Sequence, residues 1–319
     1  PTWLRRQRQM CIRDRLNTLN PWDVAYVSEK YRQQNFSLNE EEIREYFPLE
    51  RVLEGLFSIT GELFDLQFEA VADNTLYHRD VRLFHLKQQG EVIAACYMDL
   101  FAREKKRGGA WMADCRSRWR NASGQLQLPV AFLSCNFRPA SGEKPALLSH
   151  DEVTTLFHEF GHGLHHMLTQ QDVLGVSGIA GVEWDAVELP SQFLENWCWQ
   201  KESLERITQH FETGEALPED LLNNMLAAKN FNAGMMMVRQ LEFSLFDMLL
   251  HCLSNIQDAS QIQDLLDQVR EKTAVIDPPL EVRFQHGFGH IFAGGYAAGY
   301  YSYKWAELLS ADCFSAFEE

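Results

Sequence analysis

The chain has 319 residues, of which 45% are hydrophobic and 23% charged, and this composition is that of a folded globular protein with a large core. The net charge is −16, from 29 basic and 45 acidic residues, which argues against a nucleic-acid-binding protein because such proteins carry a basic surplus or stripe. Since no apolar run reaches the length of a membrane span, we expect neither nucleic acid nor a membrane among its partners.

The two ends of the chain differ in character from its middle. Residues 1–15 are strongly basic, and they lack the apolar stretch of a signal peptide. We expect them to be a non-native or disordered segment. Residues 305–319 have helical periodicity that stops without a cap, so we expect a domain over residues 16–319 that is truncated at both ends.

The cysteines indicate a reducing compartment. Their number is odd, their spacings are wide and no CxxC pair occurs, which argues against a disulfide framework and against a thiolate zinc site. We therefore expect free thiols and a cytoplasmic location. The seven residues are Cys11, Cys96, Cys115, Cys135, Cys198, Cys252 and Cys313.

The first part of the chain predicts a helical region followed by a small sheet. Residues 38–70 have helical spacing, and Ser37 to Glu40 resembles a capping box in front of them. Residues 81–136 contain short apolar or alternating runs, and the pair Gln89-Gly90 is typical of a turn between two of them. This pattern predicts a sheet of three or four strands.

A dense basic run interrupts this sheet region. It comprises Arg103, Lys105, Lys106 and Arg107, beside Glu104. We interpret it as a solvated turn between strands and not as a phosphate site.

The chain from residue 149 onward is predicted to be helical. Ser149 and Glu152 form a capping box in front of an apolar run with helical spacing, and Pro190 falls in the first turn of a later helix, where it is tolerated. The fold class that we expect is mostly α, with a small inserted β-sheet. The further helices are predicted over residues 187–200, 218–229, 231–255, 258–273 and 297–317.

The helix that begins at the Ser149 capping box carries the sequence His158-Glu159-Phe160-Gly161-His162. Two histidines four residues apart share one helix face, so both imidazoles can bind one metal ion. Glu159 is rotated enough to reach a water molecule on the metal and not the metal itself. The alternative is an exposed helix face with two histidines and a glutamate, which the bare motif leaves open.

The surroundings of the motif favour a metal site. Gly161 and Gly163 each cost about 1 kcal/mol relative to alanine in a helix interior, and a helix keeps such residues where another backbone or a ligand comes close. The opposite face of the helix is apolar, so the helix is buried. Buried histidines and a buried glutamate need partners, and a metal ion supplies them.

Catalytic zinc requires a third protein ligand and an open position. Glu188 is the best candidate for that ligand, because its neighbours Val187, Leu189 and Phe193 are apolar and carry it into the interior. The sequence therefore predicts one zinc ion per chain, bound by His158, His162 and Glu188.

Two other residues near the motif have open roles. Asp185 lies one helical turn before Glu188, and it either orients a ligand imidazole or acts as an N-cap. His165 lies near the face of His158 and His162, and we interpret it as a wall or supporting residue in preference to a ligand.

Three blocks of this sequence together resemble the thimet oligopeptidase family, and its bacterial oligopeptidases most of all. They are the motif at 158–162, the block Glu188-Leu-Pro-Ser-Gln192 followed by Glu195-Asn-Trp197, and the glycine-rich block from His290 to Tyr296 with Tyr300 and Tyr303. The resemblance extends over residues 16–319. The chain is about half as long as the family's proteins.

The resemblance implies a zincin-like helical metallopeptidase lobe, with residues 16–319 as its catalytic domain. It implies a zinc-dependent endopeptidase that hydrolyses short oligopeptides, including signal-peptide fragments, with Glu159 as the general base. His290, Tyr300 and Tyr303 would complete the catalytic residues. The expected partners are short peptide substrates, and we expect a monomer.

Two alternatives remain beside this interpretation. One is a peptidyl-dipeptidase of the same family, because the residues that would read a substrate's terminal carboxylate cannot be identified here. The other is a non-catalytic scaffold, which would be expected to lack the base or a ligand, whereas Glu159 and all three ligand candidates are present. The tyrosines also have an alternative role as core residues with satisfied hydroxyls.

Overall fold

The computed structural model describes residues 19–72, 75–279 and 281–318. The predictions for residues 1–15 and for Cys11 lie outside these ranges. The described chain divides into two compact units: residues up to Glu40 with Asp220–Trp305, and Glu41–Glu219 with Ala306–Glu319. A single catalytic domain over residues 16–319 stays a prediction.

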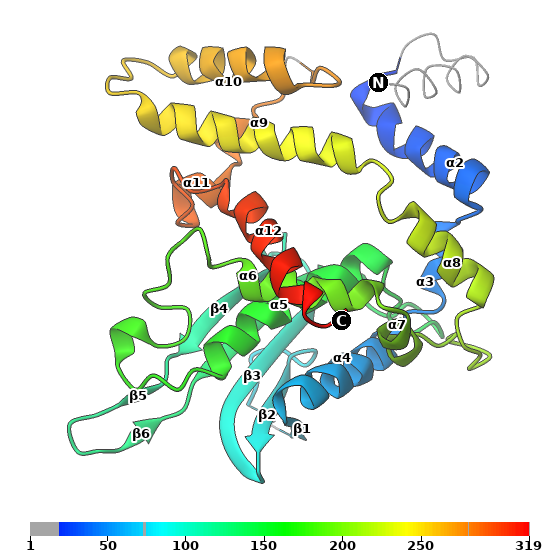
Figure 1. The fold of residues 1–319 in the computed structure, drawn as a ribbon, viewed down its shortest axis with the longest axis vertical. Helices are drawn as coiled ribbons and strands as arrows, with labels where there is room; N and C mark the ends of the chain where they lie inside the picture. Colours follow the sequence, from blue (N-terminus) through cyan, green and yellow to red (C-terminus); the bar gives the residue numbers. More distant parts are fainter. Residues whose placement is uncertain (1–18, 73–74, 280, 319) are drawn as a thin grey trace. The chain divides into compact units, whose positions relative to one another are not determined.

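A five-stranded sheet organises the unit built mainly from residues 41–219 (Figure 1). The first three strands in the sheet order form an antiparallel meander, and the fourth pairs in parallel with the third. The fifth strand is antiparallel to the fourth. The order is β1 (Gln67–Val71), β2 (Arg82–Gln88), β3 (Glu91–Phe101), β7 (Val130–Phe137) and β4 (Trp111–Arg116). A two-stranded ribbon lies apart from it, formed by β5 (Trp119–Arg120) and β6 (Leu126–Gln127).

The turn between β2 and β3 is the one that the sequence predicts. Gln89 and Gly90 both have positive φ, 53° and 85°, as a tight two-residue hairpin requires. The prediction of three or four strands misses only β1 in this sheet, because the residues of that strand were assigned to the preceding helix.

The helix predicted over residues 38–70 is in fact two helices, α3 (Glu40–Arg44) and α4 (Leu49–Phe64), followed by β1. Pro48 separates the two, because proline lacks an N–H and disfavours helical backbone at the residue before it. The predicted capping box at Ser37 is also wrong. Ser37 has a φ of 51° and ends α2 (Val24–Phe36), a helix that the sequence did not predict.

The basic run at 103–107 is only partly a solvated turn. Asp99 is buried, and its carboxylate accepts two hydrogen bonds from Arg103, at 2.6 and 2.7 Å, and one from Lys106 at 3.0 Å. The ammonium of Lys106 also donates to the carbonyl oxygens of Asp99, Phe101 and Cys135. The expectation of a fully solvated run is therefore wrong. Arg103 and Lys106 both bind the Asp99 carboxylate at the end of β3, and Lys106 also bonds to the end of β7.

Helix α5 (His150–Met167) packs against β7 and β4. The predicted capping box is present: Glu152 N–H donates to Ser149 Oγ at 3.1 Å, and Ser149 N–H donates to Glu152 Oε2 at 2.8 Å. Arg44 donates to the same Glu152 oxygen at 2.8 Å, which fixes the start of α5 to α3. The apolar face that the sequence predicted, including Leu156, Phe157 and Phe160, is fully buried.

The other unit is helical. The long helix α9 (Ala233–Cys252) packs against α10 (Ser260–Thr273), and both have nearly the bounds that the sequence predicts (Figure 1). The helix predicted over residues 297–317 starts later, as α12 (Ser302–Ser315), because residues 297–301 form a turn. Its residues from Ala306 onward belong to the unit with the sheet. The shorter elements of the chain are η1 (Pro21–Asp23), η2 (Leu174–Val176), α7 (Lys201–Ile207), α8 (Glu219–Ala228), η4 (Phe284–His286) and α11 (Gly289–Ala293).

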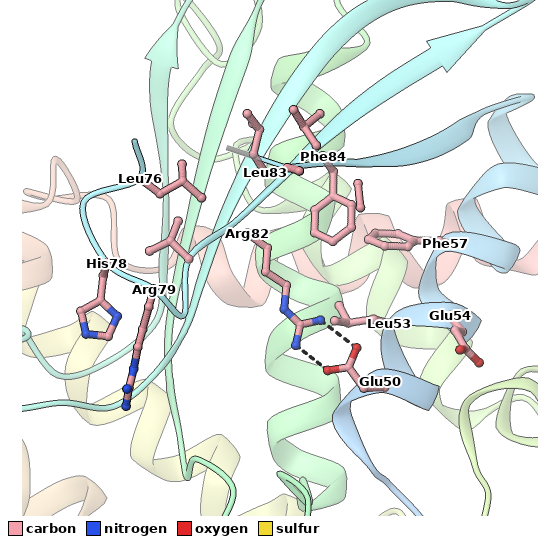
Figure 2. Close-up of a pocket in the computed structure, with 14 residues that line it drawn as sticks. Glu50, Leu53, Glu54, Phe57, Leu76, His78, Arg79, Arg82, Leu83 and Phe84 are labelled. Atoms are coloured by element: carbon pink, nitrogen blue, oxygen red, sulfur yellow. Dashed lines mark hydrogen bonds and ion pairs between the residues drawn. The ribbon is translucent and has the colours of Figure 1, made fainter. Parts of the chain in front are cut away.

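A cavity of about 750 Å³ lies between α4 and the strands β1 and β2. Figure 2 shows the ion pair of Glu50 and Arg82 there, next to the rings of Phe57 and Phe84. Its lining contains none of the predicted site residues. Among the residues that the structure describes, we find no helix with the length and apolar character needed to cross a lipid bilayer.

Candidate metal centre

Three side chains that the sequence singled out meet at one point. His158 Nε2 lies 3.2 Å and His162 Nε2 lies 3.1 Å from the same carboxylate oxygen, Oε2 of Glu188. The three potential ligand atoms all lie within 4.8 Å of one another. The arrangement can hold one metal ion, and two imidazole nitrogens with one carboxylate oxygen form a donor set that suits zinc.

The position of Glu188 depends on a close approach between two helices. Glu188 directly precedes α6 (Leu189–Glu195), which packs against α5. A Cβ atom on Gly161 would lie 2.6 Å from both the carbonyl oxygen of Pro190 and the Cα of Ser191. The prediction that this glycine admits another backbone is confirmed. Gly163 instead faces a side-chain methyl group of Leu133 on β7, at 3.1 Å.

Glu188 is held in its position before α6 by local bonds. Ser191 Oγ donates to Glu188 Oε2 at 3.0 Å and to its carbonyl oxygen at 2.8 Å. The side chain is 1% exposed. Burial alone would raise its pKa, but the imidazoles of His158 and His162 outweigh burial and lower that pKa well below its usual range. Glu188 is therefore an anionic donor at neutral pH.

A fourth residue, Glu195, orients one of the imidazoles. His158 Nδ1 lies 2.6 Å from Glu195 Oε1, so the nitrogen that faces away from Glu188 is bonded to a carboxylate. Such a bond fixes the ring orientation and increases the basicity of the donor nitrogen. The sequence contained a signal for this partner, because Glu195 follows Glu188 by seven residues and so lies two helical turns along the same face.

The sequence predicts either this kind of orienting role or an N-cap for Asp185. Asp185 lies in the turn before α6, and its own role stays a prediction. The helix expected over residues 187–200 is shorter than predicted, since α6 ends at Glu195 and continues as the 3₁₀ helix η3 (Asn196–Trp199).

Glu159 and His165 lie beside the three donors on α5. Glu159 is 6% exposed, and burial raises the pKa of its carboxyl group, as suits a proton acceptor. His165 is half-buried, and its pKa is lowered by burial and by the neighbouring His162 and His166. His165 is not among the residues of the described chain that could hold the ion together. Its role as a wall residue stays a prediction.

The remaining predicted site residues, His290, Tyr300 and Tyr303, belong to the helical unit with α9 and α10, where their rings form one cluster. The ring of Tyr300 lies 5.6 Å from that of His290 and 5.0 Å from that of Tyr303. Tyr300 is 6% exposed and packs into an aromatic core, whereas Tyr303 is half-buried and stacks on Tyr296 at 5.2 Å. The sequence predicts both tyrosines on the last helix, but Tyr300 lies in the turn before it.

Comparison with known proteins gives this geometry a context. Residues 4–319 match peptidase family M3. The chain belongs to this family. It is 54% identical to oligopeptidase A of Salmonella typhimurium over 94% of this chain and 44% of that protein. It is 48% identical to the organellar oligopeptidase A of Arabidopsis thaliana, over 95% of this chain and 39% of that protein.

A third relative is named for a different activity. The dipeptidyl carboxypeptidase of Escherichia coli is 38% identical over 94% of this chain and 44% of its own length. The chain thus spans less than half the length of the curated relatives that it matches. Family M3 implies a bound metal, and His158, His162 and Glu188 are the group that could hold it.

Proposed function

We propose that this chain carries the catalytic centre of a zinc-dependent endopeptidase that hydrolyses short oligopeptides. His158, His162 and Glu188 would bind one zinc ion per chain, and Glu159 would be the general base. The observation that carries the proposal is the convergence of two imidazole nitrogens on one oxygen of Glu188, beside a buried glutamate, in a member of a peptidase family.

The chemistry divides between the metal and the protein. Zinc, when bound, supplies a Lewis acid that polarises the scissile carbonyl group and lowers the pKa of a water molecule toward 7. Glu159 then takes a proton from the attacking water and passes it to the leaving amine. Glu195 holds the ring of His158 through its Nδ1 atom, so that the other nitrogen keeps its direction.

Three groups are proposed to assist at the substrate oxygen. Phenol or imidazole donors stabilise the negative charge that develops there, and we assign this role to Tyr303 first, with Tyr300 and His290. Support comes from the family resemblance and from the half-buried position of Tyr303. Tyr300 has the weaker structural support, because its ring is buried in the core of its unit.

An edge of the sheet offers a place for the substrate backbone. The two edge strands are β1 and β4, and α5 packs against β4. We propose that an extended peptide pairs with β4, since main-chain hydrogen bonds bind substrates with little dependence on their sequence.

The substrate class follows from the relatives. Relatives that are 54% identical to this chain over the matched region are named oligopeptidase A, so short peptides are the proposed substrates. The family resemblance adds signal-peptide fragments to this proposal. We further propose a monomer in the cytoplasm, where the free thiols at the described cysteines would stay reduced.

A second candidate is a peptidyl-dipeptidase, which the similarity to dipeptidyl carboxypeptidase favours. An internally quenched peptide with a blocked C-terminus separates the two modes. An endopeptidase cleaves it, and product mapping finds internal cuts, whereas a peptidyl-dipeptidase leaves it intact.

The proposal itself is tested with Glu159→Gln. Metal analysis should find one zinc per chain in both the unsubstituted protein and the variant, while the variant should lose turnover by about 10²-fold or more. A variant with near-normal kcat would show that Glu159 is not the proton acceptor.

A further inference from the structure

A buried carboxylate on α9 holds the backbone of a distant turn. Asp247 is 1% exposed, and each of its two oxygens accepts a hydrogen bond from a main-chain amide. Ala298 N–H donates to Oδ1 and Tyr300 N–H donates to Oδ2, both at 2.9 Å. His251, one helical turn along α9, lies 2.9 Å from Oδ1 through its Nδ1 atom.

The turn that Asp247 holds has an unusual backbone. Gly295 has a φ of 88°, and Ala298 has a φ of 55°. This is a left-handed backbone conformation that residues other than glycine rarely adopt. Such a conformation persists only where surrounding bonds fix it. The amides on either side of Gly299 point at one carboxylate, so Asp247 supplies that constraint.

A carboxylate suits this position better than an amide would. Two N–H groups converge on the side chain from the turn, and a carboxylate offers an acceptor to each of them. An asparagine would keep one acceptor but would face the second N–H with its own amino group. Hydrogen bonds to an ionised acceptor are also stronger than those between neutral groups.

The held backbone leads directly to the aromatic cluster of this unit. Tyr300 donates its own amide to Asp247, and its ring lies 5.6 Å from that of His290 and 5.0 Å from that of Tyr303. Tyr303 lies one residue into α12, which begins directly after the turn. Displacement of residues 298–300 would therefore move both phenol groups.

We propose that Asp247 is a positioning residue for the peptide hydrolysis described above. It contacts neither substrate nor metal in this scheme. It fixes the backbone at residues 298–300 and thereby sets the place of the Tyr300 and Tyr303 hydroxyls. This inference rests on the proposed function, in which those hydroxyls assist the reaction.

The test compares Asp247→Asn with Glu242→Gln, a matched control on the same helix. Glu242 is also buried, at 3% exposed, but its carboxylate bonds to Arg270 at 3.0 Å and to Arg239 at 2.6 Å. Both variants remove one buried charge and should lower the melting temperature. Only Asp247→Asn should lower kcat, by about 10-fold or more, with KM and metal content nearly unchanged.

Two further measurements separate positioning from a loss of stability. In hydrogen exchange, the amides of residues 298 and 300 should lose protection in Asp247→Asn and keep it in Glu242→Gln. In a double variant, Asp247→Asn combined with Tyr303→Phe should lose little more kcat than Tyr303→Phe alone, because both changes remove the same assistance.

The outcomes are distinct. Lost protection with unchanged kcat in Asp247→Asn would overturn the positioning role, as would equal losses of kcat in Asp247→Asn and Glu242→Gln. If the unsubstituted protein does not hydrolyse peptides, the proposed function fails and the catalytic part of this inference fails with it. Hydrogen exchange would still decide whether Asp247 holds the turn.

Discussion

Gly161 on α5 faces Ser191 on α6 without room for a methyl group, since a Cβ atom at 161 would lie 2.6 Å from the Ser191 Cα. We expect Gly161→Ala to push α6 away from α5 and to move Glu188 relative to the two histidines. Metal affinity should fall by about 10-fold or more, as when the support of a ligand is lost. Competition titration of zinc against a chromogenic chelator would measure this.

Gly163→Ala is the control for that change on the same helix. The closest atom to its new methyl group would be the movable end of the Leu133 side chain at 3.1 Å, and no backbone atom is among its three nearest neighbours. Alanine also favours the helix by about 1 kcal/mol. We expect unchanged metal affinity. Equal losses in the two variants would mean that the approach of α6 at Gly161 does not place Glu188.

The roles of Glu188 and Glu195 at the centre can be separated. Glu188→Gln removes an anionic ligand and should nearly abolish zinc retention after dialysis. Glu195→Gln weakens only the support of His158 Nδ1, so affinity should fall by about 10–100-fold. Metal content per chain decides both. Full zinc retention in Glu188→Gln would exclude Glu188 as a ligand.

Tyr303 is proposed to donate a hydrogen bond that exists only along the reaction path. Tyr303→Phe should therefore lower kcat and kcat/KM alike, by about 10²–10³-fold, and leave KM nearly unchanged. Steady-state kinetics on one quenched peptide would show this. A core tyrosine would behave differently, with a stability loss of about 1 kcal/mol and normal kcat.

Tyr300→Phe provides the comparison, because the ring of Tyr300 lies in the aromatic core. If Tyr300→Phe loses kcat while Tyr303→Phe keeps it, the assignment of the two tyrosines is reversed.

The Asp99 cluster makes a prediction about stability and pH. Burial raises the pKa of Asp99, but hydrogen bonds from Arg103, Tyr77 and Lys106 outweigh burial and lower that pKa from 3.8 to about 2. The unfolded chain therefore binds the proton more readily, and the stabilisation is complete above about pH 4 and lost as the pH falls toward 2. Asp99→Asn should cost about 3–5 kcal/mol at pH 7, because it leaves the buried ammonium of Lys106 without its carboxylate partner.

Urea unfolding of the unsubstituted protein and of Asp99→Asn at pH 7 and pH 3 would test this. The difference in their free energies of unfolding should be smaller at pH 3. Asp172→Asn is a suitable control, since Asp172 pairs with Arg118 and Arg120 at a more exposed position. A difference for Asp99→Asn that does not depend on pH would contradict the assigned cause.

The sequence predicted the parts of the centre that depend on helical spacing. His158, Glu159 and His162 lie on one regular helix with its own capping box, so their relative placement is local. Glu188 was predicted as the third ligand from its apolar neighbours alone. No role was predicted for Glu195, although its spacing of seven residues from Glu188 is that of two helical turns.

Other contacts have no local pattern from which to predict them. Nothing in the sequence near Asp247 indicates that its carboxylate meets the amides of residues 298 and 300. The burial of Lys106 likewise depends on Asp99, Phe101 and Cys135 coming together at the ends of two strands. Such contacts follow from the pairing of distant strands and helices.

The parallel pairing of β3 with β7 also imposes an order of assembly. The meander of β1, β2 and β3 closes through neighbouring residues, whereas β7 reaches β3 only after residues 102–129 have been looped out. Closing a long loop has an entropic cost that short hairpins avoid, so non-local pairs form more slowly. The surface on which α5 lies is completed by β7 and β4, and the histidines of α5 therefore gain their support only in the later steps of folding.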